Sequence, residues 1–271
     1  TPLSMALAAS RKAIERSGID PAQINAVLVA TGSHTRQFPS LAVSVAAGLG
    51  LKDPAATDLS AACAGFCYGV SLADSMVRTG TAKNVLVVGV EILTRQTDFI
   101  DRGTAFLFGD GAGAVVVGPS ETPGIGPVVW GSDGESADVI WSDDWNEAFA
   151  SGKKPVIHME GNKVFRWATT FIAEKPAEAL EAAGLKPEEL DVFIPHQANN
   201  RITDSMLRRM HLPESVVISR DIRQMGNSSA ASIPIAMEAL LESGDAKSGD
   251  TALVIGFGAG LVYAGQVVVL P

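Results

Sequence analysis

The chain has 271 residues, 46% of them hydrophobic, with a formal net charge of −9 and two cysteines. This length and apolar content suit one large domain or two closely packed ones, and no apolar run is long enough for a transmembrane helix. The acidic balance disfavours broad binding to nucleic acid or to an anionic membrane, and without a recognisable signal peptide we expect a cytoplasmic protein with reduced thiols.

The first predicted element is a helix at residues 2–17. Thr1 can cap its start, Pro2 fits its first turn, and Gly18 can end it. Its buried face is expected to carry four apolar residues, which are Met5, Ala8, Ala9 and Ile14. Because a domain seldom begins inside an element, we expect that a segment upstream of Thr1 is absent from the sequence.

Segment 58–70, DLSAACAGFCYGV, places Cys63 among small residues at the predicted start of a helix. A free cysteine is usually buried as a small hydrophobe, which is one interpretation. The other is a nucleophile, because a helix N-terminus lowers the pKa of a thiol and presents N–H groups to whatever the sulfur attacks. Cys67, four residues later, suits neither a disulfide with Cys63 nor a zinc site, so we expect no metal.

A strand is predicted at 84–91, NVLVVGVE, and segment 91–108 separates it from the next strand. An inserted segment of this kind commonly covers a neighbouring site. GDGAGA at 109–114 imitates a dinucleotide-binding loop, but the following VVVG continues as a strand where such a loop requires a helix. We therefore reject it as a cofactor loop and expect no cofactor.

Strand-like sequence resumes at 124–135, and His196 follows the apolar strand DVFIP. The next predicted helix, ANNRITDSMLRRM, has one buried stripe, formed by Ile202, Met206 and Met210. A different face carries Arg201, Ser205 and Arg208, with Arg209 near its edge. Such a face is usually solvated, but in an acidic protein it equally suits docking of an anion. The remaining histidines are interpreted as structural: His34, His158 and His211.

Two further segments contain small and polar residues, MGNSSAASIP at 225–234 and GFGAGL at 256–261. Asn227 after Gly226 is by itself typical of a turn. GFGAGL lies between predicted strands, so it is not a phosphate loop of the Rossmann type. Its small residues permit the close backbone approach that an N–H donor to a reacting oxygen requires.

The two halves of the chain repeat one pattern. The matching segments are 13–32 with 179–198, at an offset of 166, and 84–91 with 251–258, at an offset of 167. Two separate matches at nearly one offset predict an α/β fold built from duplicated βαβ halves, which we place at 1–120 and 121–271. Segment 124–135 has no counterpart in the first half, so that half is expected to lack its first strand.

The same offset aligns the Cys63 loop with the loop that contains Asn227. If the halves pack about a pseudo-dyad, equivalent strand ends converge, and sites in α/β sheets form at such ends. The sequence therefore predicts one candidate site that contains Cys63, His196 and Asn227.

Five motifs resemble, in order and spacing, β-ketoacyl-acyl carrier protein synthase III, a condensing enzyme of the thiolase fold: DLSAACAGF, HMEGNKVFRWA, IPHQANNRI, GNSSAASIP and GFGAGL. The resemblance covers essentially the whole chain. It implies a thiolase-like α/β fold in α/β/α/β/α layers, a homodimer, and a further N-terminal segment with some coenzyme A contacts. The family's commoner FGGG is FGAG here, which retains a backbone donor.

The resemblance also implies an activity. An acyl-CoA primer, acetyl or short and branched, would condense with malonyl-acyl carrier protein to give 3-oxoacyl-acyl carrier protein, carbon dioxide and coenzyme A, which initiates fatty acid biosynthesis. Cys63 would carry the acyl group, and His196 and Asn227 would hold the malonyl thioester oxygen during decarboxylation. The backbone N–H groups of Cys63 and Ala259 would form the oxyanion hole. Neither a metal nor a cofactor beyond these substrates is implied.

Binding residues follow from the same matches. The coenzyme A and phosphopantetheine tunnel would be lined by Arg102, Gly161, Asn162, Phe165, Asn199 and Arg201. The carrier protein would dock on Arg166, Arg201, Arg208 and Arg209. Phe38 matches a residue that reaches from the dimer partner to close the acyl pocket, which favours a short primer.

Several alternatives remain open from the sequence. A polyketide-type ketosynthase or acyltransferase also uses Cys, His and Asn, whereas a thiolase needs a second cysteine in its C-terminal half, and both cysteines here lie in the first half. A papain-like hydrolase has the three residues in the same chain order but lacks the duplication and has another cysteine motif. A non-catalytic acyl-binding subunit need not retain all three residues.

Overall fold

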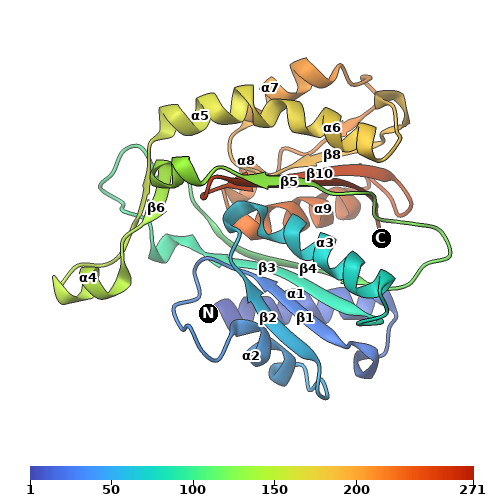
Figure 1. Cartoon of the computed structure of the whole chain (residues 1–271), viewed down its shortest axis with the longest axis horizontal. Helices are drawn as coiled ribbons and strands as arrows, with labels where there is room; N and C mark the ends of the chain where they lie inside the picture. The colour runs from blue at the N-terminus through green and yellow to red at the C-terminus, as the bar shows by residue number, and fades with distance from the viewer.

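The computed structural model describes residues 1–271 and stacks helices and sheets in five alternating layers (Figure 1). One outer layer holds α1 (Pro2–Ser17) and α2 (Leu41–Gly48), and the central layer holds α3 (Gly65–Arg78) and α9 (Ser232–Ser243). The other outer layer holds three helices: α5 (Gly161–Thr170), α6 (Lys175–Ala182) and α7 (Asn200–Met210). A sheet separates each outer layer from the centre, which confirms the predicted α/β/α/β/α arrangement.

The first sheet has four strands in the order β2-β1-β3-β4, with β4 antiparallel to β3 and the others parallel. Its strands are β1 (Ala26–Ala30), β2 (Ala55–Leu59), β3 (Val85–Ile92) and β4 (Asp110–Val117). The glycine-rich run at 109–114 thus lies almost entirely within β4. An added Cβ at Gly113 would lie 2.7 Å from the Pro234 side chain, so these glycines allow α9 to pack closely on the strand.

The second sheet has five strands in the order β5-β11-β10-β8-β9. They are β5 (Val129–Ser132), β8 (Val192–Pro195), β9 (Val217–Ile218), β10 (Thr251–Gly258) and β11 (Val262–Val269). The triplet β9-β8-β10 is parallel and β11 is antiparallel to β10, as in the first sheet. β5 pairs with β11, and within the chain no strand of the first sheet corresponds to it.

The duplication extends to the turns that begin the central helices. The 3₁₀ turns η2 (Ala62–Ala64) and η7 (Ser229–Ala231) precede α3 and α9, and each starts at positive φ, 43° at Ala62 and 50° at Ser229. Each turn packs on the other half's sheet. An added Cβ at Gly256 would lie 2.8 Å from the Cys63 carbonyl oxygen, and an added Cβ at Gly89 would lie 2.2 Å from the Ala230 carbonyl oxygen. This crossed packing confirms the predicted pseudo-dyad.

Three apolar cores lie between the layers. The central one joins both sheets to α3 and α9 through residues such as Phe66, Cys67, Val87, Ile194 and Val254. The other two lie between each sheet and its outer helices. None of the helices is both long and apolar enough to cross a bilayer.

Helix α1 begins and ends as predicted, with a Thr1 capping box and Gly18 in the left-handed conformation. Its predicted buried face is confirmed at Ile14 and wrong at Ala8, while Met5 and Ala9 are partly buried. The residues that bury fully are Ala6, Ser10 and Ile14, a stripe of i, i+4 and i+8 spacing, whereas Ala8 is exposed.

The remaining elements lie around one end of the molecule. β6 (Ile140–Ser142) and β7 (Ile157–Met159) pair as a separate hairpin, and α4 (Trp145–Ala150) lies at its tip. This arm projects from the layered body in Figure 1. The short helix α8 (Ile222–Met225) leads into Gly226 and Asn227.

Candidate active site

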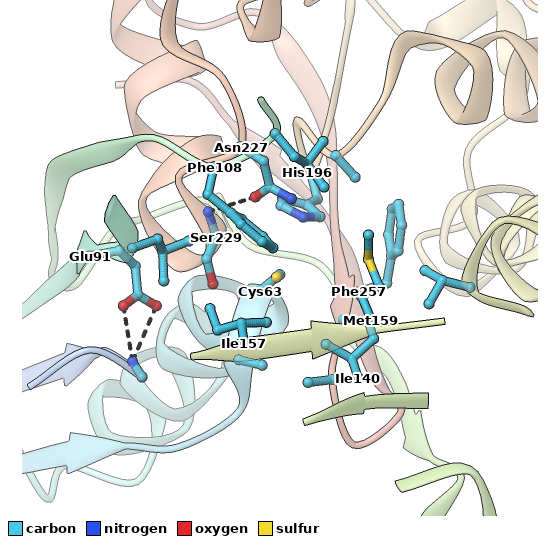
Figure 2. A pocket seen from close by; sticks show the side chains of 18 of the residues that line it. Cys63, Glu91, Phe108, Ile140, Ile157, Met159, His196, Asn227, Ser229 and Phe257 are labelled. Atoms are coloured by element: carbon cyan, nitrogen blue, oxygen red, sulfur yellow. Dashed lines mark hydrogen bonds between the residues drawn. The ribbon is translucent and has the colours of Figure 1, made fainter. Parts of the chain in front are cut away.

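The predicted residues meet at one cavity between the halves, near the carboxyl ends of β1, β8 and β10. The cavity measures about 320 Å³ and is lined by Cys63, His196, Asn227 and Ala259, all four as predicted. Figure 2 shows Cys63, His196 and Asn227 around it, with Phe108 and Phe257 among the apolar walls. Apolar residues of the β6–β7 hairpin close another side: Ile140, Trp141, Ile157 and Met159.

Cys63 lies in η2, directly before α3, so the predicted position at the start of a helix is confirmed. Gly258 at the end of β10 lies against it, because an added Cβ there would be 2.8 Å from the Cys63 Sγ. Cys63 is partly exposed to the cavity, whereas Cys67 is completely buried, and both thiols are free. The fold therefore presents one thiol and hides the other.

The environment of the Cys63 thiol differs from the one predicted for a helix start. Burial raises the pKa of this thiol to about 12, and the nearby Glu91 carboxylate raises it further. The Ser229 hydroxyl and the backbone N–H of Cys63 itself act in the opposite direction, but burial outweighs them. The expectation of a depressed thiol pKa is therefore wrong for the free protein, and a proton must leave the sulfur during reaction.

His196 follows β8 and is 2% exposed. Its Nδ1 lies 2.7 Å from the Ser232 Oγ, which also accepts the Gln197 backbone N–H at 3.3 Å. The Ser232 hydroxyl can donate to Nδ1, and in that tautomer the ring proton resides on Nε2. Burial lowers the pKa of His196 to about 3, so the imidazole is neutral near pH 7 and can donate from Nε2.

Asn227 is oriented by the backbone on both of its sides. Its Oδ1 accepts the Ser229 N–H at 2.9 Å, which leaves the Nδ2 amide as a donor. Its backbone N–H donates to the Leu107 carbonyl at 2.9 Å, and its carbonyl accepts the Gly109 N–H at 2.9 Å. Segment 91–108 thus runs beside the site, as predicted, and contributes lining residues, among them Leu93, Gln96, Leu107 and Phe108.

Two backbone donors border the same cavity. Neither the Cys63 N–H nor the Ala259 N–H donates to a carbonyl oxygen of the protein. The end of β10 lies close to Cys63, since an added Cβ at Gly258 would be 3.2 Å from the Cys63 nitrogen. A pair of unpaired N–H groups next to a nucleophile is the arrangement that stabilises an oxyanion.

The residues predicted for the coenzyme A tunnel divide into two groups. Gly161, Phe165 and Asn199 line the cavity. Arg201 follows the N-cap Asn199 and stacks its guanidinium 4.9 Å above the Phe165 ring. The other two predicted tunnel residues, Arg102 and Asn162, are exposed and lie outside the cavity lining. Phe38, which was predicted to close a partner's acyl pocket, also lies outside the lining and is 80% exposed.

The predicted docking arginines lie on α5 and α7, and all four are exposed: Arg166, Arg201, Arg208 and Arg209. Arg209 forms an ion pair with Glu174 at 2.7 Å, and Arg208 forms none. The predicted buried stripe of α7 is confirmed. The placement of Ser205 on the exposed face is wrong, because Ser205 is buried and donates to the Thr169 carbonyl at 3.3 Å.

Three polar residues of the site were not found from the sequence: Glu91, Ser229 and Ser232. Glu91 had a usable signal, because it is the one charged residue in the apolar strand VLVVGVEI. The two serines had none, since their roles depend on the positive φ at Ser229 and on the ring nitrogen that Ser232 reaches.

Comparisons with known proteins agree with this geometry. The family 3-oxoacyl-[acyl-carrier-protein (ACP)] synthase III matches residues 57–134, and its C-terminal part matches residues 180–270. A β-ketoacyl-[acyl-carrier-protein] synthase III of Streptomyces glaucescens is 56% identical over 100% of this chain and 82% of its own length. One of Mycobacteroides abscessus is 50% identical, over 100% of this chain and 81% of its own.

Solved structures show the same fold. The priming β-ketosynthase from the R1128 polyketide biosynthetic pathway superimposes with a TM-score of 0.97 at 47% identity, covering 100% of this chain and 82% of that one. The 3-oxoacyl-[acyl-carrier-protein] synthase III of Aquifex aeolicus superimposes with a TM-score of 0.92 at 37% identity, covering 99% of this chain and 84% of that one. The chain therefore belongs to the β-ketoacyl-[acyl-carrier-protein] synthase III family of condensing enzymes.

Proposed function

We propose that this condensing enzyme takes an acyl group from acyl-coenzyme A onto Cys63 and then joins it to malonyl-acyl carrier protein. The products would be coenzyme A, carbon dioxide and a 3-oxoacyl group on the carrier protein. The observation that carries the proposal is the convergence on one cavity of a partly exposed thiol, two neutral side-chain donors and two unpaired backbone N–H groups.

Acyl transfer uses the part of the site around η2. The Cys63 sulfur attacks the thioester carbonyl, and the N–H groups of Cys63 and Ala259 receive the charge that develops on its oxygen. A thioester replaces a thioester, so the acyl-enzyme stays reactive towards the second substrate. The flanking α5 and α7, with Arg201 stacked on Phe165, are placed to receive the coenzyme A or phosphopantetheine arm.

Decarboxylation uses the side chains of the second half. As the bond to the carboxylate breaks, its electrons pass to the malonyl thioester, whose oxygen becomes an enolate oxygen. The His196 Nε2–H and the Asn227 amide are neutral donors that stabilise this oxygen without removing a proton from the substrate. The resulting carbanion forms a C–C bond to the acyl-Cys63 carbonyl, the C–S bond breaks, and the Cys63 thiolate that leaves takes up a proton from solvent to regenerate the thiol.

We assign the carrier protein to the exposed arginines of α5 and α7, and we propose a homodimer in which Phe38 reaches the partner's acyl pocket. Long-range attraction of an acidic partner by such a patch acts over about 8–10 Å at physiological salt. The exposure of Phe38, 80% in the single chain, supports a role at an interface.

We expect a short primer, acetyl or a small branched acyl. The cavity of about 320 Å³ must also admit the end of a phosphopantetheine arm, which leaves little room for a long chain. Single-turnover acylation with acetyl-coenzyme A should therefore be faster than with lauroyl-coenzyme A. The reverse order would refute the short primer but not the condensation.

The decisive experiment is to incubate the protein with acetyl-coenzyme A and to locate the adduct by mass spectrometry. An acetyl group on Cys63 is expected, with none in Cys63→Ala. The matched control is Cys67→Ala, which removes the buried thiol and should leave the adduct on Cys63. An adduct on Cys67, or none in the wild-type protein, would contradict the proposal.

A second candidate is the priming of a polyketide rather than a fatty acid. It is favoured by the 47% identity to the R1128 priming β-ketosynthase. The chemistry at Cys63 is the same, so only the carrier protein distinguishes the two. Condensation assayed with malonyl groups on a fatty acid and on a polyketide carrier protein, at equal concentration, decides between them by kcat/KM.

A further inference from the structure

Glu91 is a buried carboxylate without a cationic partner. It ends the apolar strand β3 and is 1% exposed. On one side it accepts the Gly32 N–H, at 3.1 Å to each oxygen, and the Ser33 hydroxyl at 2.6 Å. On the other side the Ser229 hydroxyl and the Ala230 N–H face it. A buried ionisable group held only by neutral donors, at the edge of a reaction cavity, is a candidate for proton transfer.

Ser229 lies between this carboxylate and the nucleophile (Figure 2). Ser229, Cys63 and Glu91 line the same cavity, and the Ser229 hydroxyl lowers the pKa of both the Cys63 thiol and the Glu91 carboxyl. Its backbone is held at a φ of 50°, and its N–H is bound to the Asn227 Oδ1. A hydroxyl has one proton to donate and lone pairs with which to accept, so it can join a donor on one side to an acceptor on the other.

We propose that Ser229 and Glu91 form a relay that takes the proton from Cys63 as its sulfur attacks the acyl-coenzyme A thioester. This inference deepens the proposed function and rests on it. The S–H bond of Cys63 breaks and its proton bonds to the Ser229 Oγ, while the original Ser229 O–H bond breaks and that proton bonds to a Glu91 oxygen. The sulfur lone pair forms the new C–S bond. The coenzyme A thiolate leaves with the electrons of the broken C–S bond and regains a proton along the same path.

His196 is poorly placed to perform this step. The Ser232 Oγ occupies its Nδ1, and in the Nε2–H tautomer that donation to the enolate oxygen requires, neither nitrogen offers a lone pair to the thiol. Burial also makes it the weaker base, since the pKa of His196 falls to about 3 and that of Glu91 rises to about 7. The relay thus leaves His196 free for its role as a neutral donor.

The relay predicts a pH dependence of acylation. The groups facing Glu91 are Thr31, Gly32 and Ser33 from the end of β1 and Ser229 and Ala230 from η7, and the titratable group near it is Cys63. Burial raises the pKa of Glu91 to about 7, so the carboxylate that accepts the proton is lost as the pH falls through that value. Single-turnover acylation should then fall tenfold per pH unit on the acidic side.

The test measures acetyl-Cys63 formation in single turnovers across this pH range, by quenching and mass spectrometry, for two relay variants. Ser229→Ala leaves the carboxylate and its β1 donors in place but breaks the path. Glu91→Gln removes the acceptor. Both should lose about 10²-fold or more in rate and should lose the acidic limb near pH 7, with a rate that instead rises with hydroxide. Thermal unfolding checks that each variant is folded.

Ser33→Ala is the matched control, because it deletes another hydroxyl on the same carboxylate, away from the thiol. The Ser33 hydroxyl lowers the pKa of Glu91, so this variant should keep the limb and shift it to higher pH. If the acylation rates of Ser229→Ala and Glu91→Gln still fall at the same acidic pH as in the wild-type protein, the relay is overturned, even when both rates are lower. A limb lost only in Glu91→Gln also overturns it. Absence of any acetyl-Cys63 in the wild-type protein would instead defeat the proposed function.

Discussion

The turns η2 and η7 occupy equivalent places in the duplicated fold, but only one of them leaves its N–H groups unpaired. At an offset of 167, Cys63 corresponds to Ala230 and Ala259 corresponds to Ile92. The N–H groups of Cys63 and Ala259 lack acceptors, whereas the Ala230 N–H faces Glu91 and the Ile92 N–H donates to the Ser33 Oγ at 2.8 Å.

The difference arises at one further pair of positions. Glu91 at the end of β3 corresponds to Gly258 at the end of β10. In one half the Glu91 carboxylate faces the Ala230 N–H and the Ser33 hydroxyl receives the Ile92 N–H, and in the other half a glycine leaves room for the Cys63 thiol. The carboxylate oxygen beside the Ala230 N–H, at the place equivalent to Cys63, supports the oxyanion hole that we assign to Cys63 and Ala259.

The largest effect should come from moving the thiol across the pseudo-dyad. Cys63→Ala should abolish acyl transfer, and the double variant Cys63→Ala/Ala230→Cys should not restore it, because the N–H groups near residue 230 already have acceptors. Acyl-enzyme formation with acetyl-coenzyme A is measured by mass spectrometry. An adduct on residue 230 would show that the two turns differ less than the structure indicates.

A substitution in the second half of the chain should slow decarboxylation rather than acyl transfer. Asn227→Ala removes one of two donors to the enolate oxygen and should slow decarboxylation by about 10²–10³-fold while acetyl-Cys63 still forms and accumulates. Quenched reactions assayed for acyl-protein and released carbon dioxide measure both steps. If acylation stops while decarboxylation continues, the roles of the halves are assigned the wrong way round.

Filling the space that distinguishes the halves should also be harmful. Gly258→Ala places a Cβ where the Cys63 Sγ is only 2.8 Å away, so the thiol must shift. A displacement of about 1 Å at a reacting atom can cost about 10²-fold in rate, and we expect acylation to fall by that order. Gly134→Ala is a suitable control, because nothing lies within 4 Å of an added Cβ there. Equal acylation rates for both variants would contradict the expected clash between the added Cβ and the Cys63 thiol.

The two half-reactions should respond differently to pH. Burial lowers the pKa of His196 to about 3, so the imidazole stays neutral as the pH falls from 8 towards that value, and decarboxylation should show no acidic limb near the ordinary histidine pKa of about 6.5. Release of carbon dioxide from malonyl-acyl carrier protein, followed with pre-acylated enzyme, measures this directly. A limb near 6.5 that disappears in His196→Gln would mean that the ring titrates normally.

The smallest effect concerns docking. Arg208→Glu should raise the KM for malonyl-acyl carrier protein several-fold and weaken its salt dependence, whereas Arg209→Glu should do less, because Arg209 is already paired with Glu174. Kinetics with acetyl-coenzyme A alone serve as the control and should barely change. Equal effects of both variants on both substrates would argue against a carrier-protein surface on α7.

The sequence could predict what depends on order and periodicity. The offset between the halves is sufficient to predict that Cys63, His196 and Asn227 lie together, whereas the assignment of Ala259 within GFGAGL came from the resemblance to the family. Strand β5 and the buried stripe of α7 also followed from their patterns. These features could be predicted because they depend on the spacing of residues along the chain.

What could not be predicted depends on desolvation and on local backbone geometry. A helix start suggested a reactive thiol, but burial has the opposite and larger effect on its pKa. The positive φ at Ala62 and Ser229 has no signature in residue type, since neither is glycine. Without that φ, the sequence offered no reason to connect Ser229 with Glu91 or with Cys63.

The backbone pairing of Asn227 with Leu107 and Gly109 has a consequence for the timing of catalysis. The segment that covers the cavity is also the support of a donor to the enolate oxygen. If this segment swings away and admits water, the Asn227 amide loses its fixed position and the malonyl group is no longer activated. If Asn227 has the role that we propose, the carbanion would be generated only while this segment stays in place, which would protect the intermediate from protonation by solvent.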